Sequence, residues 1–217
     1  MARVGILGGT FNPPHIGHVA LARHARAELG LERVLLVPAN VAPNKPTVHE
    51  DPGPEHRLRM CRLAVAEEPG LEASALEIER GGMSYTVDTV QSIHDAHPNA
   101  ELTLIVGADT ARTLPGWREP ARLLGMVELA VAQRDDLDMQ DVRQALAPVT
   151  ATGCDSPPRM TLLRMARIAA SSSAVRGLIA AGAPVGELVG ETVAGYIAAH
   201  GLYRATGVSQ AVIGGAA

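Results

Sequence analysis

The sequence predicts an α/β fold in which a mainly parallel sheet is covered by helices on both faces. Short apolar runs alternate along the 217 residues with longer segments of helical spacing, an order typical of such sheets. Two turn sequences, Gly8-Gly9 and Gly107-Ala108-Asp109, each directly follow an apolar run. Ligands of these folds bind beyond the carboxyl ends of the strands. We therefore expect both turns at one ligand-binding edge of the sheet.

Apolar runs bounded by turn residues predict the strands. The first run, residues 4–7, directly precedes the glycine turn, and the run at 102–106 directly precedes Gly107. Both are short and continuously apolar, as expected of strands buried on two faces. The expected strands cover residues 4–7, 33–38, 73–78, 102–106, 126–132 and 161–165.

Helical apolar spacing and local start signals predict the helices. Pro54 opens one of them, and proline suits the first turn of a helix. The serines at 171–173 can cap another with their hydroxyl groups. The expected helices cover residues 19–29, 54–66, 86–96, 139–146, 170–181 and 188–199.

The loop and tail segments set the expected domain organisation. Prolines block regular structure over residues 39–54, and a long irregular segment in a compact domain is often functional. We expect a single domain over residues 1–204, because this length suits one core. Residues 205–217 are rich in glycine and alanine and are expected to form a flexible tail.

Composition excludes several classes of protein. Hydrophobic residues make up 47% of the chain but aromatic residues only 2%, so the core must consist of Ala, Val, Leu and Ile. A net charge of −4 gives no general basic field, so no nucleic-acid partner is expected. No apolar run approaches the ~20 residues of a membrane span, and no signal peptide is recognisable. Isolated Cys61 and Cys154 favour a reduced, cytoplasmic protein.

The segment 8–18, GGTFNPPHIGH, joins the first expected strand to the first helix. Gly8 and Gly9 lack a Cβ, so the backbone can bend sharply and approach a ligand closely. The free N–H groups at a helix start favour an anion. His15 and His18 are expected to share a face at that end, where imidazoles can donate hydrogen bonds to phosphate oxygens. The segment therefore outlines a polyphosphate site.

Two other interpretations of the histidine pair stay open at this point. His15 and His18 could bind zinc, although no third ligand stands at a metal spacing. They could also be structural and bond loop carbonyls. Neither G-x-x-x-x-G-K-[ST] nor a G-x-G-x-x-G after the first strand is present. P-loop hydrolysis and dinucleotide hydride transfer are therefore not indicated.

The segment 8–18 resembles the signature G-[GS]-[TF]-F-[DN]-P-x-H-x-G-H of the HxGH nucleotidyltransferases, whose fold is Rossmann-like and doubly wound. A second segment, 171–176 with the sequence SSSAVR, resembles their I-S-S-[ST]-x-[IV]-R, although Ala169-Ala170 replaces the usual preceding pair. The resemblance implies catalytic roles for His15, His18 and Arg176. The histidines would stabilise the charge that builds on the α-phosphate, and the arginine would support the phosphates. It implies ATP-binding roles for Gly8, Gly9, Thr10, Phe11, Lys45, Ser172 and Ser173.

Further segments resemble nicotinate-nucleotide adenylyltransferases in particular, and the resemblance covers residues 3–204. The segment 84–89, SYTVDT, is similar to their [ST]-Y-T-x-D-T, and residues 107–109 to their G-x-D. Each residue could also have a purely structural role: Thr86 could cap a helix, Asp109 could form a turn, and Trp117 could be a core aromatic. Lys45 follows Asn44, where the family has His or Pro, and Arg134 lies in QRD in place of R-P-G. The implied mononucleotide-binding residues are Tyr85, Thr86, Asp109, Trp117 and Arg134.

The resemblance implies an enzyme of NAD biosynthesis. It would transfer an adenylyl group from ATP to nicotinate mononucleotide, giving deamido-NAD and pyrophosphate. Mg²⁺ is expected to arrive with ATP, without a dedicated metal site on the protein. The expected partners are ATP and nicotinate mononucleotide, with no nucleic acid or membrane, and a homo-oligomer stays open. The alternatives are a related transferase acting on nicotinamide mononucleotide or phosphopantetheine, and a non-catalytic nucleotide-binding relative.

Overall fold

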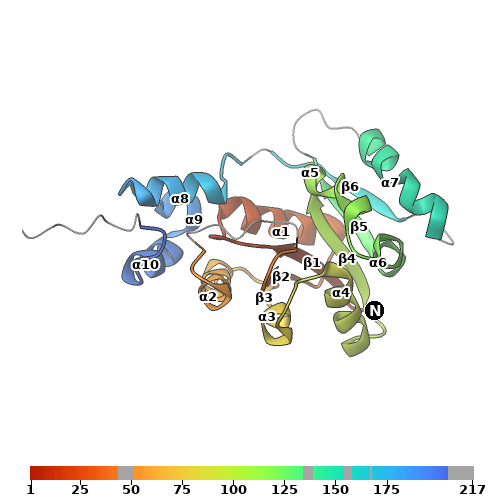
Figure 1. The fold of residues 1–217 in the computed structure, drawn as a ribbon, viewed down its shortest axis with the longest axis horizontal. Helices are drawn as coiled ribbons and strands as arrows, with labels where there is room; N and C mark the ends of the chain where they lie inside the picture. Colours follow the sequence, from red (N-terminus) through yellow and green to blue (C-terminus); the bar gives the residue numbers. More distant parts are fainter. Residues whose placement is uncertain (44–50, 134–138, 154–157, 167, 205–217) are drawn as a thin grey trace, which may run out of the picture.

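A computed structural model describes residues 1–43, 51–133, 139–153, 158–166 and 168–204. Its described strands form one sheet in the order β3-β2-β1-β4-β5-β6, and every neighbouring pair is parallel (Figure 1). The predicted α/β class with a parallel sheet is confirmed. The strands are β1 (Arg3–Gly9), β2 (Arg33–Pro38), β3 (Leu71–Ala73), β4 (Glu101–Gly107), β5 (Glu128–Ala132) and β6 (Met160–Leu163).

The strand order reverses beside β1, which places two predicted turns together. The chain goes from β1 to β2 on one side, and β4 later pairs with the other side of β1, where Ile6 lies opposite Leu104. The carboxyl ends of β1 and β4 are therefore neighbours at one edge of the sheet. This is the switch point at which ligands of open α/β sheets bind.

Helices connect successive strands, and none of those described is long and apolar enough to cross a membrane. The longer helices are α1 (Ile16–Leu29), α2 (Pro54–Ala64), α4 (Thr86–Ala96), α6 (Pro120–Met126), α7 (Met139–Gly153), α8 (Ser172–Ala180) and α10 (Glu191–Ala199). The shorter ones are α3 (Leu76–Arg80), α5 (Ala108–Ala111), η1 (Leu114–Gly116) and α9 (Gly186–Val189).

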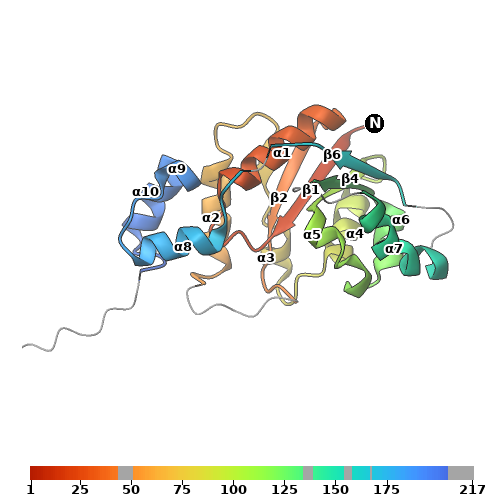
Figure 2. The same ribbon diagram turned by 90° about the horizontal axis from the view of Figure 1, so that it is seen from above.

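Apolar side chains leave the sheet in alternation and form a core on each face. Val4 and Ile6 of β1 belong to a first cluster, which also includes residues of α4, α6 and α7. Leu7 belongs to a second cluster with residues of α1 and α2. Figure 2 shows α1 on one side of the sheet and α4 and α7 on the other. The prediction of helices on both faces is confirmed.

A third group of apolar residues, the C-terminal cluster, joins α8, α9 and α10 to α2. Met60 of α2 packs there with Val175 of α8 and with Val193 and Ile197 of α10. Both ribbon views show α8, α9 and α10 gathered at one end of the molecule (Figures 1 and 2). The cluster anchors α8, the helix that begins with the serine segment.

The strand expected at residues 73–78 is wrong. β3 ends at Ala73, and α3 follows over Leu76–Arg80. The Ser74 hydroxyl accepts the N–H of Leu76 (3.3 Å), which starts a helical turn. Glu77 of this helix is buried and accepts a hydrogen bond from Thr89 (2.6 Å), a tertiary contact that the sequence does not reveal.

Several other boundaries differ from expectation. Residues 108–109, expected as a turn, open the one-turn helix α5, and the strand expected from 126 begins at 128 because α6 runs to Met126. The helix expected at 188–199 is broken into α9 and α10 at Gly190, whose φ of 84° no continuous helix accepts. α7 extends through Pro148 to Gly153. Residues 205–217, expected as a tail, lie outside the described residues.

Candidate active site

The two glycines of the glycine turn, Gly8 and Gly9, have different surroundings. Phe11 is buried with a φ of 50°, and its ring lies where a side chain on residue 9 would go. A Cβ on Gly9 would come within 3.2 Å of that ring. A Cβ on Gly8 would meet no atom within 4 Å. A side chain at residue 9 would therefore need the Phe11 ring to shift by a few tenths of an ångström, whereas the space above Gly8 is open to a ligand.

The two histidines lie together at the start of α1, as predicted. His15 is the N-cap residue, and its ring lies 3.7 Å from that of His18, centroid to centroid. The backbone N–H of His15 donates to Nδ1 of His18 (3.1 Å). Because Nδ1 accepts, the proton of the His18 ring lies on Nε2, which is then a donor.

Gly17 is the residue that lets these rings pack so closely. A Cβ at this position would lie 3.1 Å from Cε1 and Nδ1 of His15. The Phe11 ring meets the His18 ring edge-on, with centroids 4.9 Å apart. The H-x-G-H spacing therefore holds the pair in one arrangement.

The serine segment docks on the loop that follows the glycine turn. Ser172 Oγ donates to the carbonyl of Pro13 (2.8 Å), and Arg176 Nη1 donates to the carbonyl of Asn12 (2.8 Å). Arg176 also donates to Ser173 Oγ (3.3 Å). Ser171 caps α8 by accepting from the N–H of residue 174 (3.2 Å), which confirms the expected serine cap. Two motifs more than 150 residues apart in sequence thus meet.

Asn12 offers unused polar atoms at this junction. Its side chain is buried, and neither Nδ2 nor Oδ1 has a hydrogen-bond partner among the described residues. Buried polar groups are nearly always paired in native proteins. A donor and an acceptor are therefore left for water or a ligand beside the docked serine helix.

Arg57 is a residue that the sequence reasoning missed. It is 2% exposed and donates to the carbonyls of Thr10 (2.9 Å), Ala39 (2.6 Å) and Asn40 (3.0 Å), and it pairs with Asp51 (3.0 Å). It thereby ties the end of the glycine turn to the segment after β2.

A usable signal for Arg57 was present in the sequence. Arg57 shares the i, i+3, i+4 stripe with Met60 and Cys61, so its side chain faces inward. An arginine on the apolar stripe of a helix indicates a buried cation that holds polar partners.

The segment after β2 also orients the loop that leads into α4. The N–H of Asn40 bonds to Ser84 Oγ (2.8 Å), and its side-chain amide donates to the carbonyl of Gly82 (2.9 Å). Val41 and Met83 form an isolated parallel bridge. These contacts fix the approach to Tyr85, the N-cap residue of α4.

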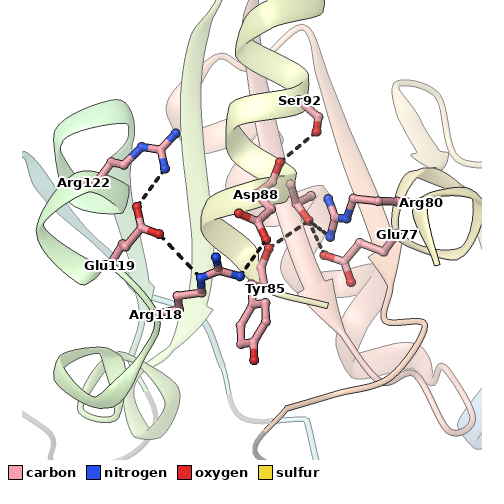
Figure 3. Close-up of polar contacts among 9 residues, drawn as sticks. Glu77, Arg80, Tyr85, Asp88, Ser92, Arg118, Glu119 and Arg122 are labelled. Carbon is pink, nitrogen blue, oxygen red and sulfur yellow. Dashed lines mark hydrogen bonds and ion pairs between the residues drawn. The ribbon is translucent and has the colours of Figure 1, made fainter. Parts of the chain in front are cut away.

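A second group of predicted residues lies at the start of α4 (Figure 3). Tyr85 is the cap, and Thr86 is the first helical residue, as expected. The guanidinium of Arg118 lies over the Tyr85 ring, with Cζ 4.7 Å from its centroid. The neighbouring Trp117 is half-buried and donates from Nε1 to Thr113 Oγ1 (3.1 Å). Thr89 connects α4 to α3, because its hydroxyl donates to Glu77 (2.6 Å) and accepts from Arg80 (3.1 Å).

The remaining predicted residues divide into one that is described and two that are not. Asp109 follows β4 as the second residue of α5 and is exposed at the edge shared with β1. Lys45 and Arg134 lie outside the described residues. Cys61 is fully buried, and burial raises the pKa of its thiol, so it is unsuited to act as a nucleophile.

Metal ligation was one alternative for the histidines. In the part of the chain that the structure describes, no three His, Cys, Asp or Glu side chains gather into a metal-binding group. His15 and His18 therefore have no third protein ligand of this kind in that part. A structural zinc site takes four ligands and a catalytic one three.

The parallel sheet, its strand order and the glycine turn at the switch point define a Rossmann-like α/β fold, and the histidine pair beside the docked serine segment has the arrangement expected of a nucleotidyltransferase. The cytidylyltransferase-like family model matches residues 6–178. The probable nicotinate-nucleotide adenylyltransferase of Roseiflexus sp. (strain RS-1) is 42% identical over 205 residues, which cover 94% of this chain and 98% of that protein. The corresponding protein of Symbiobacterium thermophilum is 39% identical, with 94% and 96% covered. The chain belongs to the cytidylyltransferase-like family, among its nicotinate-nucleotide adenylyltransferases.

Solved structures agree on the fold. Plasmodium falciparum nicotinic acid mononucleotide adenylyltransferase, complexed with NaAD, superposes with a TM-score of 0.75 at 16% identity. The match covers 94% of this chain and 98% of that one. At this identity the likeness supports the fold alone.

Proposed function

We propose that this protein transfers the adenylyl group of ATP to nicotinate mononucleotide, forming deamido-NAD and pyrophosphate. The names of its relatives, which are 39–42% identical over nearly the whole chain, support this reaction. The observation that carries the proposal is the docking of α8 on the loop that follows the glycine turn. Ser172 and Arg176 bond to the Pro13 and Asn12 carbonyls, beside the histidine pair.

In this proposal the ATP phosphates lie where β1 passes into α1. The open space at Gly8 admits a phosphate to the backbone, and the N–H groups at the start of α1 favour its charge. Nε2 of His18 donates to a non-bridging oxygen of the α-phosphate. The ATP-binding set is Gly8, Gly9, Thr10, Phe11, His15, His18, Lys45, Ser172, Ser173 and Arg176.

The chemistry needs alignment and charge stabilisation rather than a general base. The phosphate of the mononucleotide is already ionised at neutral pH and is itself the nucleophile. Its oxygen forms a bond to the α-phosphorus of ATP while the bond to the β-phosphate oxygen breaks, and pyrophosphate leaves with the electron pair. Donors such as His18 and Arg176 stabilise the charge that develops on the transferred group.

The mononucleotide would bind at the start of α4. Trp117 stacks on the pyridine ring, and Asp109 accepts from ribose hydroxyls. Backbone N–H groups near Tyr85 and Thr86 receive the nicotinate carboxylate, and Arg134 completes the set. The support is that Tyr85 and Thr86 begin α4, and that Arg118, which directly follows Trp117 in the chain, contacts Tyr85 and Asp88 there.

Mg²⁺ enters this proposal as part of the ATP substrate. The donor set fits that role, because the described residues offer no cluster of three ligand side chains and Mg²⁺ is commonly held by phosphates and water. When bound, the ion neutralises charge on the phosphates. A cytoplasmic location is part of the same proposal and is supported by Cys61, a free buried thiol.

A comparison of acceptors tests the proposal. The protein is incubated with Mg-ATP and, separately, with nicotinate mononucleotide, nicotinamide mononucleotide or phosphopantetheine, and pyrophosphate is measured. We expect the fastest release with nicotinate mononucleotide, together with a product of the mass of deamido-NAD. Fastest release with another acceptor would contradict the assigned substrate. ATP binding without pyrophosphate from any acceptor would indicate a non-catalytic relative.

A further inference from the structure

Arg118 is a cation at the start of α4 that no step of the proposed reaction has used. Its guanidinium carbon lies 4.7 Å from the centroid of the Tyr85 ring, and Nη1 lies 3.4 Å from Oδ2 of Asp88. Tyr85 is the N-cap residue of α4, and Asp88 is in its first turn. Arg118 also directly follows Trp117 in the chain. Figure 3 shows it between α4 and the Glu119 segment, above the Tyr85 ring.

The surrounding charges hold Arg118 only loosely. Glu119 binds Arg122 at 2.8 Å, and this hydrogen bond keeps the pKa of Glu119 below its usual value, so the carboxylate stays ionised. Arg118 has longer contacts, at 3.4 Å to Asp88 and 3.5 Å to Glu119. Its side chain is 48% exposed. Its donors can therefore turn to a better anion that arrives beside Tyr85.

We propose that Arg118 is a specificity-determining residue that favours the acid form of the pyridine mononucleotide over the amide. The inference rests on the proposed function and on the acceptor position at α4. A nicotinate carboxylate and a nicotinamide carboxamide are close in shape and differ by one negative charge. Arg118 attracts that charge and also offsets Asp88, which would otherwise repel it. The carboxamide gains no comparable charge interaction.

The test is Arg118→Gln, assayed for kcat and KM with each mononucleotide at saturating Mg-ATP. The substitution keeps a polar side chain but removes the charge. We expect the KM for nicotinate mononucleotide to rise about tenfold, the order of one charge–charge interaction near a protein surface. The KM for nicotinamide mononucleotide should change by less than about twofold. Arg118→Lys keeps the charge and should retain part of the preference for the acid.

Arg122→Gln is the matched control. Arg122 belongs to the same network but contacts Glu119 and Gln91 (2.8 and 2.9 Å) rather than Tyr85. We expect its acid-to-amide ratio to fall less than that of Arg118→Gln, because the cation over the Tyr85 ring remains. An unchanged ratio in Arg118→Gln, with an active wild type, would overturn this inference and leave the proposed function standing. A wild type that forms no dinucleotide with either substrate would overturn both.

Discussion

His18 is the residue whose chemistry the local structure defines most sharply. The His15 N–H occupies its Nδ1, so Nε2 is the nitrogen that can donate to a phosphate. A donor aimed at charge that develops during the reaction acts mainly on turnover.

We therefore expect His18→Ala to lower kcat by about 10²- to 10³-fold, the usual effect of removing such a donor. The dissociation constant for ATP should change far less. His24→Ala on the same helix is the control, because His24 pairs with Glu28 (2.7 Å), further along α1 than the histidine pair. Near-normal turnover in His18→Ala would refute the assigned role.

Arg57 works through position, because it holds the carbonyls of Thr10, Ala39 and Asn40 and pairs with Asp51. In Arg57→Leu these groups lose their common donor, and Asp51 loses its cation. We expect the free energy of unfolding, measured in urea, to fall by about 3–5 kcal/mol. Arg59→Leu, at an exposed position of the same helix, should change it little. Equal losses in the two variants would show that Arg57 holds nothing specific.

These two residues also mark how far sequence reasoning reaches at this scale. The positions of His15 and His18 follow from helix spacing, a local property, and they were predicted. The partners of Arg57 come from two segments that meet only in the folded protein. A local sequence pattern cannot predict a contact between segments that are distant in the sequence.

At the scale of elements, the start of α1 depends on Gly17. A Cβ there would lie 3.1 Å from the His15 ring and would force it to move. We expect Gly17→Ala to reduce kcat while far-ultraviolet circular dichroism shows the fold intact.

The control for this element is Gly195→Ala in α10, where a Cβ meets no atom within 4 Å. Alanine should stabilise that helix by about 0.5–1 kcal/mol and leave activity unchanged. Wild-type kcat in Gly17→Ala would mean that the close packing of the histidine rings has no catalytic consequence.

The elements differ in how well the sequence predicted them. α4 begins and ends at the predicted residues, 86 and 96, and its buried Val87, Val90 and Ile93 recur at helical spacing, which is a local property. The segment after β3 was expected to be a strand as part of a short apolar run, a pattern that a strand and a helix can share. Its helix α3 is stabilised by Glu77 bonded to Thr89 of α4, a tertiary contact. Local periodicity could not decide between the two structures.

The whole molecule has a core on each face of the sheet and a C-terminal cluster that reaches α2. Its fold class was predictable because strands and helices alternate in sequence. The order of the strands was not, because it depends on which edge each crossover joins. We propose that residues 1–204 form one cooperative domain, in which α2 links the C-terminal cluster to the second cluster.

Cooperativity gives a prediction for Ile197, a buried residue of the C-terminal cluster. Ile197→Ala should lower the free energy of unfolding by about 2–5 kcal/mol. The single tryptophan, Trp117, packs against the first cluster and reports on it by fluorescence. In Ile197→Ala, the unfolding transition seen by Trp117 fluorescence should shift together with the one seen by circular dichroism. A fluorescence transition that stays in place would indicate two independent units.

The most direct test is a crystal structure with Mg²⁺ and a non-hydrolysable ATP analogue. We expect the triphosphate at the junction of β1 and α1, with the α-phosphate in hydrogen-bond range of His18 Nε2 and with Ser173 and Arg176 of α8 beside the phosphates. A triphosphate bound elsewhere, out of reach of both the histidine pair and α8, would contradict the assignment of the site.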